Sequence, residues 1–77
     1  MVVDIITPDK SLFSGEAVAV TVPGTDGSLG ILDKHAPLIS ALKRGKVKVT
    51  TAGGEDFYDI AGGVVEVQQN KVIILAE

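Results

Sequence analysis

The chain has 77 residues, of which 45% are hydrophobic, and it contains no cysteine. A chain of this length forms one small domain, residues 1–77, with a core near the lower size limit. Because cysteine is absent, neither disulfides nor thiolate metal sites are available to stabilise it. The net charge of −3 disfavours binding to the backbone of a nucleic acid. Aromatic stacking platforms are also scarce, since Phe13, Phe57 and Tyr58 are the only aromatic residues.

No segment predicts a membrane span or a targeting signal. The N-terminus has no basic region followed by a long apolar run, and no apolar stretch approaches the roughly 18 residues of a spanning helix. We therefore expect a soluble, cytoplasmic chain whose isolated domain folds as a monomer without a metal ion or cofactor.

The first third of the chain predicts short strands separated by turns. Residues 2–6 predict a half-buried strand, with Val3 and Ile5 on one face and Asp4 on the opposite face. A second apolar run at residues 12–13 is followed by Ser-Gly-Glu at 14–16, which suggests a bulge or bend. Residues 17–22 alternate cleanly, with all three valines on one face and small residues on the other. The Pro-Gly pair that follows ends this strand.

The next segment, residues 24–42, breaks the alternation. Gly27 and Gly30 bracket a Ser-Leu pair, a spacing that predicts a tight turn leading into a short strand. A polar, exposed segment, Asp-Lys-His, is expected at residues 33–35. Pro37 then excludes helix at the residue before it, because its ring forces that residue towards extended geometry. A surface loop with so many backbone constraints often carries function.

The second half adds four regular strands. Residues 46–50 give the clearest half-buried pattern, with lysines on one face and valines on the other. Residues 56–60 pair back on them, and residues 64–68 alternate again. The pair 69–70 forms a hairpin loop, because asparagine tolerates positive φ. The closing run, residues 71–76, contains four consecutive aliphatic residues that look buried on both faces.

Together these segments give eight candidate strands and no amphipathic helix of ten residues. Many short strands separated by short turns predict an all-β fold, a small two-sheet sandwich or flattened barrel.

Residues that carry chemistry are sparse. His35 is the only histidine, and no motif presents a nucleophile to it. One histidine with dispersed carboxylates gives no cluster of metal ligands. Gly24, Gly27 and Gly30 are spaced like a phosphate-binding loop, but neither the Gly-Lys-Ser/Thr motif nor a helix follows. We expect no catalytic, metal-binding or cofactor-binding residues, and a docking module rather than an enzyme.

The most specific motif is the run GSLGIL at residues 27–32, followed by HAPL at residues 35–38. This combination resembles the epsilon subunit of F-type ATP synthases, which is called delta in mitochondria. The resemblance extends to Phe-Ser-Gly at 13–15, to Gly-Gly at 62–63 with Val-Glu-Val at 65–67, and to the closing strand. It covers essentially the whole chain, with its landmarks in order.

The resemblance implies a two-sheet β-sandwich of about ten strands, placed in the rotary central stalk. There it would bind the gamma subunit and the c-ring, and couple proton or sodium transport to ATP synthesis as a non-catalytic subunit. The whole complex is membrane-bound, so the chain would lie peripherally at the cytoplasmic face of the bacterial inner membrane.

The matching motifs imply a partner interface on two groups of residues. We expect the glycine turn to face the c-ring, the HAPL group to face gamma, and both groups to lie close together at one side of the sandwich. The implied interface residues are Gly27, Ser28, Leu29, Gly30, His35, Ala36, Pro37 and Leu38.

The sequence departs from the family pattern in two ways. Many relatives carry an acidic residue in the glycine turn where this chain has Ser28, which makes that end of the interface less charged. Most relatives continue into a C-terminal helical hairpin, and this sequence has none. It is either a short form or the N-terminal domain of a longer protein.

Two alternatives belong to other classes. A lipoyl or biotinyl carrier domain is also a small acidic sandwich, with a modified lysine on an exposed hairpin. Residues 33–36 place Lys34 in a similar setting, although His35 and Pro37 disrupt the pattern. A sandwich that binds carbohydrate or peptide would need aromatic platforms, which this chain lacks.

Overall fold

The computed structural model describes all 77 residues, and every regular element in it is a β-strand. The nine strands are β1 (Val2–Ile6), β2 (Ser11–Glu16), β3 (Ala19–Gly24), β4 (Gly27–Leu32), β5 (Leu38–Leu42), β6 (Gly45–Thr51), β7 (Gly54–Ile60), β8 (Gly63–Gln68) and β9 (Lys71–Ala76). No helix of the length and apolarity needed to span a membrane is present. The all-β prediction is confirmed, with one strand more than the eight that the pattern suggested.

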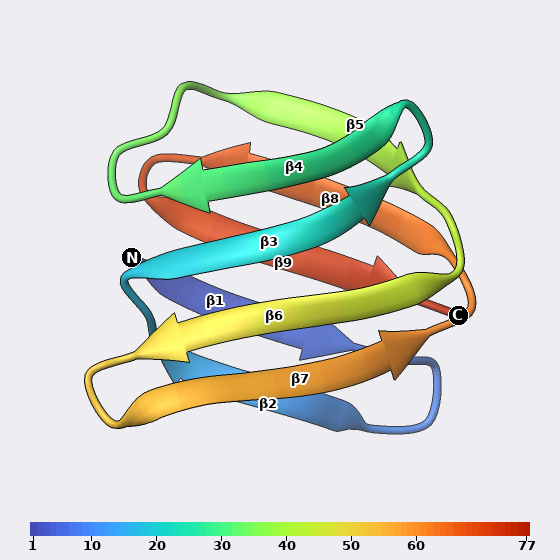
Figure 1. Ribbon diagram of the computed structural model, residues 1–77, viewed down its shortest axis with the longest axis horizontal. Helices are drawn as coiled ribbons and strands as arrows, with labels where there is room; N and C mark the ends of the chain where they lie inside the picture. The colour runs from blue at the N-terminus through green and yellow to red at the C-terminus, as the bar shows by residue number, and fades with distance from the viewer.

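The strands form two layers joined along one hydrogen-bonded path (Figure 1). One layer has the order β2-β1-β9-β8-β5, and the other has the order β4-β3-β6-β7. All paired strands are antiparallel except β1 and β9, which run parallel. The layers are linked where Gly24 of β3 pairs with Leu42 of β5. The two-sheet sandwich predicted from the sequence is therefore confirmed.

The core between the layers is aliphatic and follows the period of two along the strands. Val3 and Ile5 of β1, for example, are fully buried, while Val2 and Ile6 on the same strand are each 39% exposed. Sixteen buried hydrophobic residues form one cluster, and no polar residue is buried with them. Full burial of one such side chain contributes about 1.5–3 kcal/mol. With no disulfide, this cluster is the main source of stability.

Two predicted burial patterns are wrong. Val18, expected on the same face as the two later valines, is 55% exposed while those two are buried, and Ala17 is buried instead. The reason is that β3 begins at Ala19, so residues 17 and 18 belong to the connection from β2 rather than to the strand. In β9 the aliphatic run alternates, and Leu75 is 55% exposed. Only one face of this layer is covered, so a strand in it cannot be buried on both sides.

Two predicted boundaries also differ. Residues 14–16 do not bend away but remain in β2, and the register shift of the β1–β2 pair lies between Ile5 and Ile6. Pro23 does not end its strand; it lies within β3 opposite Ser28. The carbonyl oxygen of Pro23 accepts a hydrogen bond from the Lys43 amide (2.8 Å) where β3 meets β5 and β6.

The tight turns depend on positive φ. Gln69 (φ 52°) and Asn70 (φ 59°) form the predicted loop between β8 and β9, and both lie in the left-handed region. This geometry is the one that a two-residue hairpin needs to match strand twist. The hairpin prediction for residues 69–70 is therefore confirmed.

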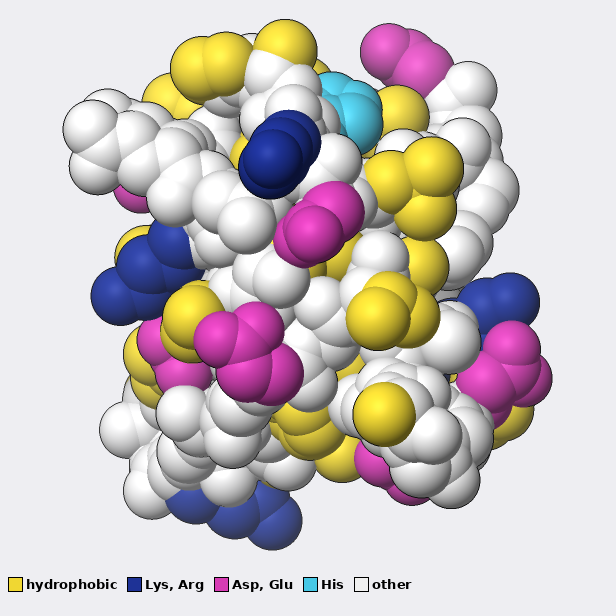
Figure 2. All heavy atoms as spheres, turned by 90° about the vertical axis from the view of Figure 1, so that its left-hand side faces the viewer, with side chains coloured by type: hydrophobic (Ala, Val, Ile, Leu, Met, Phe, Trp, Pro, Cys, Tyr) yellow, Lys and Arg dark blue, Asp and Glu magenta, His cyan; other side chains and the backbone are white.

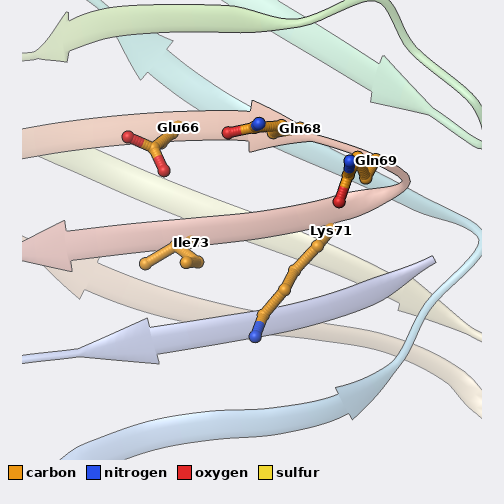
Figure 3. Close-up of a pocket in the computed structure, with 5 residues that line it drawn as sticks. All are labelled: Glu66, Gln68, Gln69, Lys71 and Ile73. Carbon is orange, nitrogen blue, oxygen red and sulfur yellow. The ribbon is translucent and has the colours of Figure 1, made fainter.

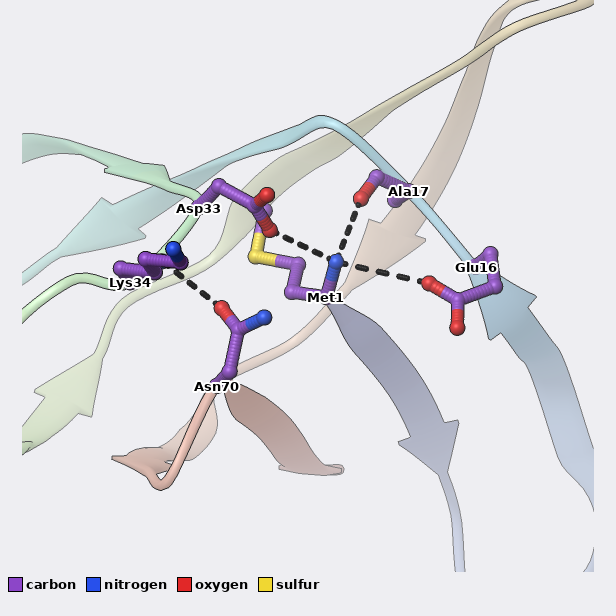
Figure 4. Close-up of polar contacts among 6 residues, drawn as sticks. All are labelled: Met1, Glu16, Ala17, Asp33, Lys34 and Asn70. Carbon is purple, nitrogen blue, oxygen red and sulfur yellow. Dashed lines mark hydrogen bonds and ion pairs between the residues drawn. The ribbon is translucent and has the colours of Figure 1, made fainter.

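A cluster that we call the N-terminal clasp holds one end of the sandwich together (Figure 4). The amino group of Met1 donates hydrogen bonds to Asp33 Oδ1 (2.8 Å) and to the carbonyl oxygen of Ala17 (3.1 Å). It also lies 3.4 Å from Glu16 Oε2. The hydrogen bond to Asp33 raises the pKa of the Met1 amino group, and the same contact lowers the pKa of the Asp33 carboxyl. The clasp thus joins β1, the β2–β3 connection and the loop after β4.

The β8–β9 hairpin completes the clasp. Asn70 Oδ1 accepts a hydrogen bond from the Lys34 amide (2.7 Å), and the Asn70 carbonyl oxygen accepts one from Val2 (3.2 Å). Lys34 has φ of 62°, a conformation that is uncommon for a residue with a side chain. The loop after β4 is consequently shaped by groups far away in the sequence.

Replacing Gly63 with alanine should destabilise the domain strongly. Gly63 has φ of 138°, and an added Cβ would collide with the carbonyl oxygen of Leu75. Gly54 is the matched control, since it has φ of 134° but nothing within 4 Å of an added Cβ. We expect Gly54→Ala to cost about 1–3 kcal/mol from backbone strain alone, and Gly63→Ala to cost clearly more in urea unfolding. Equal losses in the two variants would contradict this assignment.

Replacing Asp33 with asparagine should lower the melting temperature most between about pH 4 and pH 8, the ordinary pKa range of the two groups. The lowered pKa of Asp33 gives stability that is lost as the pH falls through its folded value. The raised pKa of the Met1 amino group gives stability that is lost as the pH rises through its folded value. Asp9→Asn, in the exposed turn after β1, serves as the control. A difference from the parent that is constant from pH 2 to pH 10 would argue against the ion pair.

Candidate partner-binding site

The first group of predicted interface residues lies on β4. Gly27 pairs with Gly24 and has φ of 132°, so the turn is formed by Thr25 and Asp26 between them. The tight turn predicted between Gly27 and Gly30 is therefore wrong. A local glycine spacing did not distinguish a glycine that closes a hairpin from one that lies inside the strand.

Gly30 lies in the middle of β4, opposite Thr21, and is not among the residues with positive φ. An added Cβ would meet nothing within 4 Å. Gly30→Val would be severe for the fold if this φ were positive, so we expect no backbone strain from it. Ser28 and Gly30 are exposed on the outer face of the strand, while Leu29 between them is half-buried against the core.

The second group follows β4 in the loop of residues 33–37. The amide of His35 donates a hydrogen bond to the carbonyl oxygen of Leu32 (3.1 Å), and His35 Nδ1 lies 2.7 Å from the carbonyl oxygen of Ala36. His35, Ala36 and Pro37 are exposed, whereas Leu38 opens β5 and is half-buried against the core. The loop thus presents His35 on a backbone held by the N-terminal clasp.

The two groups lie together only in part. β4 begins at the turn on the right of Figure 1 and ends at the loop on the left, so Gly27 and His35 lie at opposite ends of the sandwich. The groups do meet between the strands, where Leu29 and Leu38 line one opening. We call this opening the upper seam. It has a volume of about 200 Å³ and is lined by Gly24, Asp26, Gly27, Ser28, Leu29, Leu38, Ile39 and Ser40.

The end of the sandwich that carries His35 has mixed charge. Figure 2 shows this end, with the single histidine at the surface beside hydrophobic side chains and with acidic and basic side chains interspersed below it. Lys34 and Asp33 contribute one charge of each sign to the loop itself. The surface therefore offers no large patch of one sign.

The remaining hollows give little basis for chemistry. One shallow polar hollow of about 260 Å³ lies over β8 and β9, with Glu66 and Lys71 among its lining residues (Figure 3). Its lining residues include no serine, cysteine or histidine. No group of three or more histidine, cysteine, aspartate or glutamate residues is placed to hold a metal ion.

Sequence reasoning missed two exposed apolar residues beside the predicted site. Leu32 on β4 is 64% exposed, and Ile39 on β5 is 71% exposed. The alternation of residues 38–42 carried a signal, because a core-facing Leu38 and Leu42 require Ile39 to face outward. The roles of Met1 and Asn70 in holding the loop had no local signal.

Comparison with known proteins identifies the family. All of residues 1–77 match the family model described as ATP synthase, Delta/Epsilon chain, beta-sandwich domain. The ATP synthase epsilon chain of Delftia acidovorans is 46% identical over 76 residues, which are 97% of this chain and 55% of that protein. The epsilon chain of Xanthomonas euvesicatoria is 52% identical over 75 residues and 54% of its length. The epsilon chain of Chlorobium limicola is 49% identical over 75 residues, 85% of its length.

Solved structures show the same fold. A chain of the Euglena gracilis mitochondrial ATP synthase, in its OSCP/F1/c-ring assembly, superposes with a TM-score of 0.91 at 26% identity, over 99% of this chain and 49% of that chain. A chain of the Tetrahymena thermophila mitochondrial ATP synthase central stalk and c-ring superposes with a TM-score of 0.85 at 23% identity, over 99% of this chain and 62% of that chain.

The chain thus spans about half the length of several curated relatives that it matches and most of the length of another. The whole-length family match, the identities near 50% and the common sandwich agree. The chain belongs to the ATP synthase delta/epsilon family, as its β-sandwich domain.

Proposed function

We propose that residues 1–77 act as an epsilon-type domain of the central-stalk rotor, which binds the gamma subunit and the c-ring and couples ion transport to ATP synthesis. The observation that carries this proposal is the family match over the entire chain. The Euglena superposition over 99% of the chain supports it further. In this role the domain is a non-catalytic, peripheral component at the cytoplasmic face of the bacterial membrane.

A rotor connector must transmit torque without deforming. The extensive hydrogen bonding of the domain gives it the rigidity that this role requires. Forty-eight backbone hydrogen bonds join 77 residues. No buried side-chain polar atom lacks a hydrogen-bond partner. A fully satisfied, close-packed interior has low compressibility and transmits strain.

The geometry revises how the two partners would be reached. The turn before Gly27 and the loop that carries His35 are separated by the length of β4. Six strand residues at about 3.3 Å each extend about 20 Å. We propose that the Gly27 end contacts the c-ring and that His35, Ala36 and Pro37 contact gamma, so that β4 spans the distance between the two partners.

The carrier alternative rests on Lys34, which lies in the loop after β4 with its backbone amide bound to Asn70. The family match gives this alternative no support, since it describes an ATP synthase chain. An intact mass of the purified chain with an adduct on Lys34 would revive it.

Reconstitution tests the proposed function directly. Membrane vesicles carrying the ATP synthase depleted of this chain should recover ATP-driven proton pumping when the chain is added back. Pumping and ATP hydrolysis are measured on the same vesicles, because a coupling subunit raises the ratio of pumping to hydrolysis. An unchanged ratio after stoichiometric binding would refute the coupling role.

His35→Glu should weaken binding to the gamma subunit by roughly tenfold, which corresponds to about 1.4 kcal/mol. His35 is exposed and its ring makes a hydrogen-bond contact only with the neighbouring Ala36 carbonyl oxygen, so the melting temperature of the domain should not change. Ser11→Glu, exposed on β2, adds the same charge at another edge and is the matched control. Unchanged affinity in a folded His35→Glu domain would remove this loop from the gamma interface.

A further inference from the structure

The upper seam lies between two strand edges that have no neighbour. β4 pairs only with β3, and β5 pairs with β8 and meets β3 at the single residue pair that links the layers. The loop after β4 closes the seam at one end, and the junction of Gly24 with Leu42 closes it at the other. An unpaired strand edge presents a row of free N–H and C=O groups, which another strand can bind.

The hairpin between β3 and β4 fixes which groups of β4 face the free edge. In a two-residue hairpin the closing pair, here Gly24 and Gly27, exchanges hydrogen bonds. Alternate residues along β4 therefore bond to β3. The N–H and C=O groups of Ser28 and Gly30 and the N–H group of Leu32 point the other way, towards the free edge. The Leu32 carbonyl oxygen already accepts a hydrogen bond from the His35 amide.

The edge strands at the opposite side, β2 and β7, are protected against the addition of another strand, whereas β4 and β5 are not. At the lower edge, the rings of Phe13 on β2 and Tyr58 on β7 lie 6.0 Å apart and close the gap between the layers. β7 also carries Glu55, Asp56 and Asp59. Charged side chains on an edge strand discourage pairing with another chain.

By contrast, β4 and β5 carry no charged side chain and no proline. Their outward side chains include Leu32 and Ile39, among the most exposed large hydrophobic residues of the protein. Gly30 adds no side chain to the outer face of β4, and an added Cβ there would meet nothing within 4 Å. The upper edge thus has the features that favour strand addition.

We propose that an extended, uncharged segment of the gamma subunit adds to the free edge of β4 as a further strand. This inference rests on the proposed function, because it specifies how gamma is bound. Such a segment forms hydrogen bonds with the N–H and C=O groups of Ser28 and Gly30 and with the N–H group of Leu32. Its alternate side chains fall on the upper seam, where Leu29 and Leu38 favour apolar groups. The absence of charge on β4 and β5 selects against a charged segment, since burying an unpaired charge is costly.

Amide hydrogen exchange distinguishes strand addition from other docking modes. In the free domain, the amides of Ser28, Gly30 and Leu32 should exchange fast, as should those of Glu55, Phe57 and Asp59 on the free edge of β7. In the complex with gamma, the β4 set should slow by about tenfold or more while the β7 set stays fast. The measurement uses NMR on the labelled chain after exchange in the complex.

Proline substitution gives an independent test, because proline removes one edge N–H and is tolerated on edge strands. Gly30→Pro should weaken binding to gamma by about tenfold, the effect of a lost hydrogen bond in a shielded site. Phe57→Pro removes an equivalent N–H on β7 and should leave the affinity unchanged. The melting temperature of each variant shows whether it remains folded.

The outcomes separate this inference from the proposed function. Tight binding to gamma with unprotected β4 amides overturns strand addition and leaves the rotor assignment intact. Protection on β7 alone, or a loss of affinity in Phe57→Pro but not in a folded Gly30→Pro, also overturns it. If Gly30→Pro does not fold, the exchange experiment decides alone. Failure of the parent chain to bind gamma overturns both proposals.

Discussion

The fold depends on one-sided burial in two facing sheets. The chain has no disulfide and no candidate metal site to hold it together, and its interior is a single cluster of aliphatic side chains. Each layer can cover only one of its faces, so buried apolar residues alternate with outward-facing residues along most strands. Polar groups are excluded from the interior by the same constraint, because no partner for them exists there.

Each of the two open sheets has an outer strand at either side. Such outer strands are either bridged to the facing sheet by side chains or left without a neighbour. β2 and β7 are brought together by Phe13 and Tyr58, two of the only three aromatic residues in the chain. β4 and β5 have no such bridge, and their core-facing leucines line an opening instead. The two layers are therefore bridged by side chains at the β2–β7 side and remain open at the β4–β5 side. The strands at the open side include most of the residues that the family motif had indicated.

The sequence predicted the features that depend on local period and turn chemistry. The half-buried pattern of residues 46–50 and the hairpin at residues 69–70 both follow from neighbours along the chain. Val18 and Leu75 were misplaced because their exposure depends on where the chain crosses between layers and on which faces are covered. Neither fact is present in a short window of sequence. The interface that the motif implies stays a prediction, and glycine spacing alone misplaced its turn.

The contacts of the N-terminal clasp could not be predicted from the sequence for the same reason, and they position the loop that carries His35. Met1 and Asp33 are 32 positions apart, and Lys34 and Asn70 are 36 positions apart. These contacts fix the loop that presents His35, while the closing pair of Gly24 and Gly27 fixes the other end of β4. Both ends of this strand are thus anchored to the rest of the sandwich. A strand anchored in this way keeps the spacing between its two ends constant under load, which is what the proposed contact with two partners requires.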